Sequence, residues 1–347
     1  MAPARISAEF APSDRPKETS TKAELPKDKQ TLEQQIRRDD LAPLWNAGGP
    51  PSAPEPHTKH IPAVWRYADT KRHLLSAVDL VSPDEAERRA VLMINPGPRQ
   101  PPFTTDVLLA AHQLITPGEK ALCHRHSPFA VRFLIEGEHG YTAIDGKKMY
   151  MAPGDLIITP RWNWHDHGNE GTENVIWLDG LDIPLFKSIP IDFTEHYVDD
   201  HGTEYHPSTA CTDEKARAMK FPWATMESKL DAESGEYACI EYQHQDGSSV
   251  STTIGASAER INAGAQSKRR METASHIFQT HRGAGWVEVR SANGKQVYQL
   301  TFGAHDSFVI PCWHSFVIHA DEEGPVYLFC FTDKPMQKLL GLWRSKA

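Results

Sequence analysis

The sequence predicts an all-β protein made of two β-barrels of the double-stranded β-helix, or jelly-roll, type, preceded by a few short helices. Two features of the 347 residues support this fold class. From about residue 86 onward, short apolar runs are separated by Gly, Pro, Asp and Asn, which is the spacing typical of all-β sandwiches and barrels. The second feature is an internal repeat, which indicates that one barrel follows another along the chain.

The repeat is visible as equal spacings in the two halves. Gly118 precedes His124 by six residues, and Gly264 precedes Arg270 by the same six. The pattern Asp-x-x-x-x-Pro-x-Trp also occurs in each half, at corresponding places. In this register the paired positions are His124 and Arg270, His126 and Glu272, and His165 and Phe316.

The N-terminal part is predicted to contain helices. Residues 1–30 carry four prolines among polar residues and are expected to form a flexible arm. Thr31 and Gln34 have the spacing of a capping box, so a short helix is expected to start there. A second helix is expected near Ser82, because Pro83 suits the first helical position. The predicted parts are 1–30, arm; 31–85, helices and linker; 86–190, first barrel; 191–234, linker; and 235–347, second barrel and C-terminal tail.

Three histidines of the first barrel form a candidate metal site. His124 and His126 lie two residues apart, so both project from one face of a strand. His165 follows His124 by 41 residues, after a Gly-Asp turn and an apolar strand. This succession is the layout of a cupin metal site, so the fold is predicted to be a bicupin. Three imidazoles suit Zn, Cu, Fe or Ni and leave coordination positions open for a substrate.

The second barrel is predicted to lack a metal. Arg270, Glu272 and Phe316 occupy its three corresponding positions, so the ligand set is lost. His314 lies two residues from the third position, and we expect it to pack or to line the rim of a pocket.

Composition excludes several classes of protein. The net charge of −9 argues against a nucleic-acid binder, which needs a basic face. No apolar stretch approaches the length of a membrane span or a secretory signal, so no membrane association is expected. Five scattered cysteines without a Cys-x-x-Cys motif fit reduced thiols. A cytoplasmic protein is expected.

The residues that follow His126 set the charge of the site. Many cupins add a glutamate ligand four or five residues later, where this chain has Ala130 and Val131. A divalent ion held by three neutral imidazoles keeps its full charge, which favours a chelating anionic substrate. Fe(II) in such a site has room for a bidentate substrate and O2 together.

Other polar residues are expected around this pocket. Alternation places Arg132 on the inner face, where its guanidinium can hold a substrate carboxylate or pair with an acid such as Asp179. His167 shares the strand face of His165 and is a candidate hydrogen-bond donor, proton shuttle or rim residue. Arg88 and Gln113 are further candidates to line the pocket.

Several motifs together resemble the gentisate 1,2-dioxygenase family of bicupin ring-cleaving enzymes, which includes salicylate and 1-hydroxy-2-naphthoate dioxygenases. The motifs are Val64–Asp69, Glu87–Arg89, Gln113–Glu119, His124–Ser127, Arg132–Phe133, Glu136–Gly137, Gly154–Pro160, Phe331–Pro335 and Leu340–Arg344. They extend from about Leu44 to the C-terminus. The family often has Trp in the stretch before Gln113, where this chain has Val107–His112.

The resemblance implies Fe(II) held by His124, His126 and His165, with an aromatic acid chelating the metal through adjacent carboxylate and hydroxyl groups. It implies ring opening by O2 between the carbons that bear these groups, with gentisate, converted to maleylpyruvate, as the expected substrate. It also implies a homotetramer. The pocket residues implied are Arg132 and Arg88, for the carboxylate, and Gln113, His167 and Asp179, for orienting substrate or oxygen.

Two kinds of alternative remain open at this point. The first is the same reaction on salicylate, a 5-substituted salicylate or 1-hydroxy-2-naphthoate. The second is a metal-binding bicupin without redox chemistry, such as an isomerase or a storage-type protein. A three-histidine thiol dioxygenase is a further alternative, although such enzymes are usually single cupins.

Overall fold

The computed structural model describes residues 25–46, 55–82, 88–98, 101–212 and 218–346. The chain divides into two compact units, Met1–Pro54 and Glu55–Ala347. The described part of the first unit contains helix α1 (Lys29–Arg38) and the short 3-10 helix η1 (Leu44–Asn46). The second unit contains every strand that the structure describes.

Helix α1 begins earlier than the sequence predicted. Asp28 is the N-cap: its Oδ1 accepts a 2.8 Å hydrogen bond from the backbone N–H of Thr31, and its Oδ2 accepts one from the Thr31 hydroxyl. The predicted start at Thr31 was therefore wrong, because Asp28 satisfies the exposed helix donors one turn earlier. The helix expected after Ser82 falls on residues 83–87, which lie outside the described residues.

The first barrel is built from two six-stranded sheets, whose strands pair mostly in antiparallel orientation. Its strands are β2 (Arg89–Leu92), β3 (Leu109–Ile115), β4 (Lys120–His126), β5 (Ala130–Glu136), β6 (Gly140–Ile144), β7 (Lys147–Tyr150), β8 (Leu156–Thr159), β9 (His165–Asn169), β10 (Val175–Leu181), β11 (Thr194–His196), β12 (Thr209–Ala210) and β13 (Lys220–Phe221). The strand orders are β13-β8-β5-β10-β3-β2 and β11-β4-β9-β6-β7-β12. The histidine-bearing strands β4 and β9 are neighbours in the second of these sheets.

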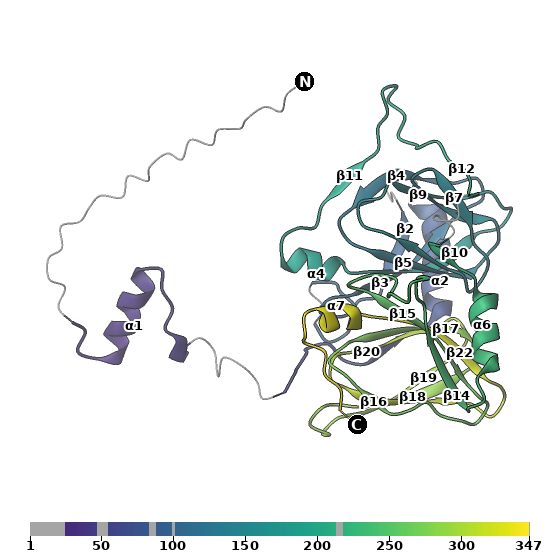
Figure 1. Cartoon of the computed structure of the whole chain (residues 1–347). Helices are drawn as coiled ribbons and strands as arrows, with labels where there is room; N and C mark the ends of the chain where they lie inside the picture. The colour runs from purple at the N-terminus through teal and green to yellow at the C-terminus, as the bar shows by residue number, and fades with distance from the viewer. Residues whose placement is uncertain (1–24, 47–54, 83–87, 99–100, 213–217, 347) are drawn as a thin grey trace. The chain divides into compact units, whose positions relative to one another are not determined.

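The second barrel repeats this design with a six-stranded and a four-stranded sheet. Its strands are β1 (Ala63–Trp65), β14 (Tyr237–Glu241), β15 (Gly255–Ile261), β16 (Arg270–Met271), β17 (His276–Arg282), β18 (Gly285–Arg290), β19 (Val297–Phe302), β20 (Ser307–Ile310), β21 (Ser315–Ala320) and β22 (Val326–Thr332). The orders are β1-β20-β17-β22-β15-β14 and β16-β21-β18-β19. The prediction of two successive jelly-roll barrels is thereby confirmed, and Figure 1 shows both.

The two barrels share one hydrophobic core. Phe133 of the first barrel stacks on Phe329 of the second, with ring centroids 4.5 Å apart. Helices contribute Leu74 and Leu230 to the same core. Because burial of aromatic and aliphatic side chains is the main stabilising term, the barrels are expected to fold as one unit.

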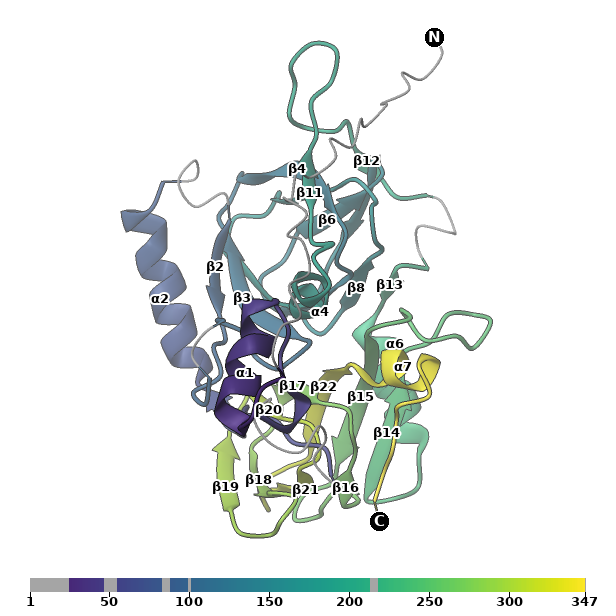
Figure 2. The same ribbon diagram turned by 90° about the vertical axis from the view of Figure 1, so that its left-hand side faces the viewer.

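Four helices accompany the barrels in the described part of the second unit: α2 (Tyr67–Leu80), α4 (Ile183–Ser188), α6 (Trp223–Ala232) and α7 (Lys334–Leu339). Helix α2 packs against β2 and β3, as Figure 2 shows. The sequence reasoning predicted neither α2 nor α6. None of the described helices combines the length and the apolar character that a membrane crossing requires.

The backbone confirms the predicted repeat residue by residue. Gly118 and its counterpart Gly264 have φ values of 75° and 69°, and Trp162 and its counterpart Trp313 have 61° and 58°. Opposite pairs across the strands also match, since His124 faces His165 and Arg270 faces Phe316. The N–H of Trp162 donates to the His126 carbonyl, and that of Trp313 donates to the Glu272 carbonyl. The predicted pairing of all three positions is therefore correct.

Candidate metal centre

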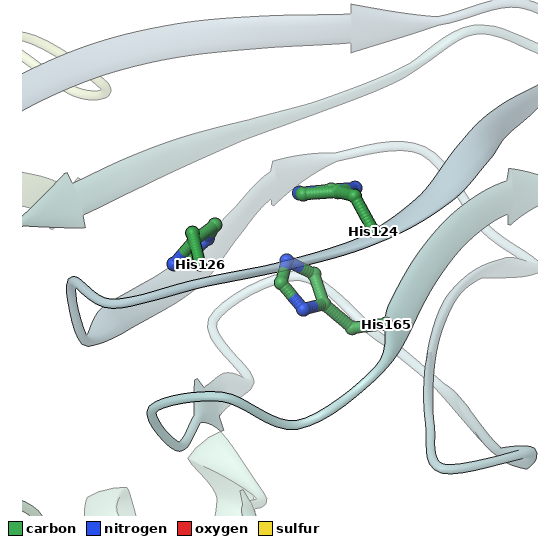
Figure 3. A group of neighbouring side chains, drawn as sticks. All are labelled: His124, His126 and His165. Carbon is green, nitrogen blue, oxygen red and sulfur yellow. The ribbon is translucent and has the colours of Figure 1, made fainter. Parts of the chain in front are cut away.

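Two neighbouring strands bring the three histidines together. His124 and His126 lie on β4, and His165 lies on β9 directly opposite His124. One ring nitrogen of each histidine lies within 4.8 Å of the other two. Figure 3 shows the rings converging from the two strands. This is the one group of metal-ligand type found in the described ranges.

Backbone carbonyls orient all three rings in the same way. The Nδ1 atoms of His124, His126 and His165 lie 3.1, 2.8 and 2.9 Å from the carbonyl oxygens of residues 122, 128 and 163. Because a carbonyl oxygen only accepts, each Nδ1 carries the hydrogen and donates it. Each Nε2 then carries the lone pair, which is the arrangement that metal-binding histidines require, and the lone pair of His124 accepts a hydrogen bond from Arg88.

Burial keeps these imidazoles neutral. His124, His126 and His165 are 1%, 8% and 2% exposed. Desolvation is the first cause that lowers the pKa of His124 to about 2 and that of His126 to about 4, and it holds the pKa of His165 well below its ordinary value. Three neutral nitrogen donors in a buried setting fit a divalent transition metal.

Arg88 reaches the histidine cluster from outside the two strands. Its Nη2 lies 2.7 Å from Nε2 of His124. This guanidinium is the second cause of the low pKa of His124, after desolvation. A cationic, planar donor at the edge of the cluster is suited to an anionic group that binds beside a metal.

Arg132 forms a buried ion pair with Asp179. Its Nη2 lies 2.8 Å from Asp179 Oδ1, and both side chains are at most 7% exposed. The N–H of Trp177 donates to the other carboxylate oxygen at 2.9 Å. The ion pair that the sequence left as one alternative for Arg132 is thus present. The Nε of Arg132 has no hydrogen-bond partner among the described residues.

A threonine that the sequence reasoning overlooked links Arg132 to His167. Arg132 Nη1 donates to Thr142 Oγ1 at 3.3 Å, and that oxygen lies 3.1 Å from Nδ1 of His167. Thr142 stands directly opposite His167 on the neighbouring strand β6. The sequence feature that could have pointed to Thr142 is a threonine at an inward position of an otherwise apolar strand.

Gln113 lies on the inner wall of the same barrel. It is 4% exposed and sits opposite Trp177, on the face that also carries Ile115. Ile115 and Trp177 both belong to the apolar cluster inside the first barrel. Of the five predicted pocket residues, three form one network (Arg132, Asp179 and His167), Arg88 contacts a histidine, and Gln113 occupies the adjacent wall.

The corresponding region of the second barrel holds an ion pair. Arg270 donates from both terminal nitrogens to Glu259, at 2.8 and 2.9 Å. Its guanidinium also lies 4.6 Å from the ring of Phe316. His314 is half-buried and its Nδ1 lies 3.0 Å from the carbonyl of residue 312. Sequence reasoning anticipated the lost ligands but not Glu259 as the partner of Arg270.

Comparison with known proteins agrees with this geometry. Residues 111–181 match the family described as Cupin domain. The chain is 31% identical to 5-aminosalicylate 1,2-dioxygenase of a Comamonas species, over 92% of this chain and 90% of that protein. It is 29% identical to gentisate 1,2-dioxygenase 1 of Aquipseudomonas alcaligenes, over 93% and 98%.

A solved structure is similar over nearly the whole length. Salicylate 1,2-dioxygenase from Pseudoaminobacter salicylatoxidans, determined as adducts with gentisate, superposes with a TM-score of 0.82 at 28% identity and covers 94% of this chain and 96% of its own. The similarity therefore extends over both barrels. This chain belongs to the gentisate 1,2-dioxygenase family of bicupin ring-cleaving dioxygenases.

Proposed function

We propose that the chain is an Fe(II)-dependent dioxygenase that opens the ring of a hydroxylated aromatic acid between its carboxyl- and hydroxyl-bearing carbons. Gentisate is the substrate that we propose first, with O2 as co-substrate. The observation that carries the proposal is the convergence of three neutral imidazole nitrogens in a buried pocket, with a guanidinium at its edge.

The donor set suits this metal. His124, His126 and His165 would hold Fe(II) through Nε2, because each Nδ1 is committed to a carbonyl. Arg88 would have to give up its hydrogen bond to Nε2 of His124 when the ion binds. Bound there, Fe(II) would supply a Lewis-acidic centre with open positions for a chelating hydroxy acid and for O2. Neutral donors leave the charge of the ion uncompensated, so an anionic chelate is favoured over a neutral one.

Two guanidinium groups near the histidines are suited to bind the substrate carboxylate. Arg132 already has an internal anion, Asp179, and would contact substrate through the hydrogens that Asp179 leaves free. Arg88 lies at the histidine cluster itself. We assign both Arg88 and Arg132 to the substrate carboxylate, and Arg132 also sets the charge of the inner wall.

Thr142 determines which nitrogen of His167 carries its hydrogen. The hydroxyl oxygen accepts from Arg132, so its own hydrogen is available for Nδ1 of His167. Burial, with the nearby Arg132 charge as the next cause, holds the pKa of His167 well below its ordinary value, so the ring is neutral. His167 would then present an Nε2–H donor that orients substrate or oxygen.

The wall of β3 favours a second candidate substrate class. Leu109 and Ala111 share the strand face of Gln113 and are 6% and 4% exposed. Small and aliphatic side chains at these positions suit a ring with fewer hydroxyl groups, such as salicylate, or a larger one, such as 1-hydroxy-2-naphthoate. Gln113 is the one polar side chain of this wall that can hydrogen-bond to a further ring hydroxyl.

The assembly and location are proposed from family membership. We propose a homotetramer in the cytoplasm. Light scattering of the purified protein is expected to give four times the chain mass of 38.9 kDa. A monomeric mass would contradict the assembly without affecting the chemistry.

The test is O2 uptake by protein loaded anaerobically with Fe(II). Gentisate, salicylate and 1-hydroxy-2-naphthoate are supplied in parallel, and ring loss is followed by absorbance. We expect one O2 consumed per ring lost with at least one of the three acids. Consumption with gentisate alone selects the first proposal, and consumption with another acid selects the second.

The competing class predicts a different outcome. A metal-binding bicupin without redox chemistry would bind metal at the same histidines and consume no O2 with any of the acids. One iron per chain without uptake across the whole panel would therefore overturn the dioxygenase proposal.

A further inference from the structure

The second barrel contains a cavity of about 370 Å³ at the position that the metal centre occupies in the first. Arg270 and Glu272, the counterparts of His124 and His126, are among its lining residues. The other walls come from β14, β15 and α7. This volume lies within the range of pockets that bind small molecules.

The lining of this cavity is strongly basic. Lys268, Arg269, Arg270, Lys334 and Lys338 contribute five positive side chains. Two acidic side chains line it as well. A cationic excess is notable in a chain whose net charge is −9. Clustered positive charge in a concave site favours binding of an anion.

Not all of these cations are neutralised within the protein. Glu259 pairs with Arg270, Glu288 with Arg269, and Glu272 with Lys334. Lys268 and Lys338 form no ion pair with a carboxylate in the part of the chain that the structure describes. The charges of these two ammonium groups are therefore not neutralised by a carboxylate, although that of Lys338 also lies 5.6 Å from the ring centroid of Trp343.

A buried nitrogen in the wall also lacks a partner. His276 is 5% exposed, and its Nε2 makes no hydrogen bond with any described residue. The nearest carboxylate oxygen, on Glu272, is 3.8 Å away, which is too far for a hydrogen bond. A buried polar nitrogen without a partner costs stability, so a ligand that reached it would recover that loss.

The chemistry of the wall favours an organic anion over a metal ion as the occupant. Within the described residues, three ligand atoms from His, Cys, Asp or Glu come together only at the histidines of the first barrel. Tyr237 and Pro335 add apolar surface beside the charged groups. The combination matches a small molecule that has both a carboxylate and a carbon skeleton.

We propose that this cavity of the second barrel binds a small organic carboxylate. The ammonium groups of Lys268 and Lys338 hold the carboxylate, and His276 faces the body of the ligand. The barrel that lost its metal ligands thus keeps a binding site at the same place. This inference does not depend on the proposed dioxygenase reaction, and either can fail without the other.

Isothermal titration calorimetry on the full-length, iron-loaded chain under nitrogen tests the proposal, with benzoate and succinate as probes. The variant Lys268→Ala/Lys338→Ala is expected to weaken binding of at least one probe by about ten-fold, because two attractive charges are removed. The matched control, Lys229→Ala/Lys295→Ala, removes two exposed ammonium groups outside the cavity and is expected to leave binding unchanged.

Two further variants locate the site. Ser249→Glu introduces a negative charge at an exposed lining position and is expected to weaken binding without disturbing the core. His165→Ala removes a metal ligand of the first barrel and is expected to leave this binding in place. Binding that is lost in His165→Ala but unaffected by the lysine substitutions would overturn the proposal. So would the absence of measurable heat with either probe at about 10 mM.

Discussion

The two barrels place the same backbone around different chemistry. In the first, two opposite positions on neighbouring strands hold His124 and His165, and in the second they hold Arg270 and Phe316. The imidazoles are buried, neutral and aimed at one point. Arg270 is instead fixed by two hydrogen bonds to Glu259. The comparison teaches that the jelly-roll supplies positions, while three side chains decide whether a metal can bind.

The barrels also differ in how they balance a buried positive charge. Arg132 of the first barrel pairs with Asp179, which also accepts a hydrogen bond from the indole N–H of Trp177. Arg132 donates a further hydrogen bond to the hydroxyl oxygen of Thr142. Arg270 of the second donates from both terminal nitrogens to Glu259, which is itself 0% exposed, and its Nε, like that of Arg132, has no hydrogen-bond partner among the described residues. Arg132 therefore divides its terminal nitrogens between a carboxylate and a hydroxyl, whereas Arg270 gives both of its terminal nitrogens to one carboxylate.

The largest expected effect comes from removing one metal ligand. His165→Ala is expected to lose bound iron and, with it, all measurable turnover, because two imidazoles cannot hold the ion as three do. Iron is measured by plasma emission and turnover by O2 uptake. His314→Ala, in the second barrel, is the matched control and should keep both. Iron retained by His165→Ala would remove this residue from the ligand set.

The ion pair of the second barrel is expected to matter for stability rather than turnover. Arg270→Met leaves the buried Glu259 carboxylate without its cationic partner and with the Tyr237 hydroxyl as its remaining donor, which is expected to lower the free energy of unfolding by about 3–5 kcal/mol. Urea unfolding followed by circular dichroism measures this change. Adding Glu259→Gln to the same chain should recover much of the loss.

An exposed pair provides the comparison for that experiment. Arg290 pairs with Glu288 at the surface, where solvent screens the pair, and Arg290→Met is expected to cost much less than Arg270→Met. If Arg270→Met were no more costly than Arg290→Met, the second barrel would not depend on its buried ion pair.

A smaller effect is expected from a change of cation in the first barrel. Arg132→Lys keeps the charge beside Asp179 but loses the planar array of donors, so we expect KM to rise by about ten-fold. Iron content should stay near that of the unmodified protein, since Arg132 is not a ligand. Steady-state O2 uptake and metal analysis give the two values, and a variant without iron would contradict the assignment.

The smallest expected effect concerns Thr142. Thr142→Val removes the hydrogen bonds to Arg132 and His167, and we expect kcat to fall by about two- to ten-fold with normal iron content. Thr142→Ser keeps the hydroxyl and should restore the rate. Equal rates for the Val and Ser variants would show that the hydroxyl does not position His167.

Sequence reasoning reached the features that depend on spacing. The two barrels, the register between them and the grouping of His124, His126 and His165 all follow from turns and strand alternation. Those rules are local, so they transfer from the sequence to the fold. The family membership added the ring-cleaving activity.

Features that depend on contacts between residues far apart in the sequence could not be predicted from the sequence. Glu259 meets Arg270 across two strands that are separated by a loop, and no spacing rule connects them. The carbonyls that orient the imidazoles are backbone groups, so residue types do not reveal them. Helix α2 has few strongly apolar positions, and its fold depends on packing Leu74 into the shared core. The start of α1 was misplaced because Asp28 and Thr31 are both good caps and only one is used.

The central claim is that metal chemistry is confined to the first barrel. Anomalous diffraction at the iron absorption edge, from crystals of the Fe(II)-loaded chain, tests it most directly. The account predicts one anomalous peak per chain, among His124, His126 and His165. A peak in the second barrel, or none at the three histidines of a protein that binds iron, would contradict it.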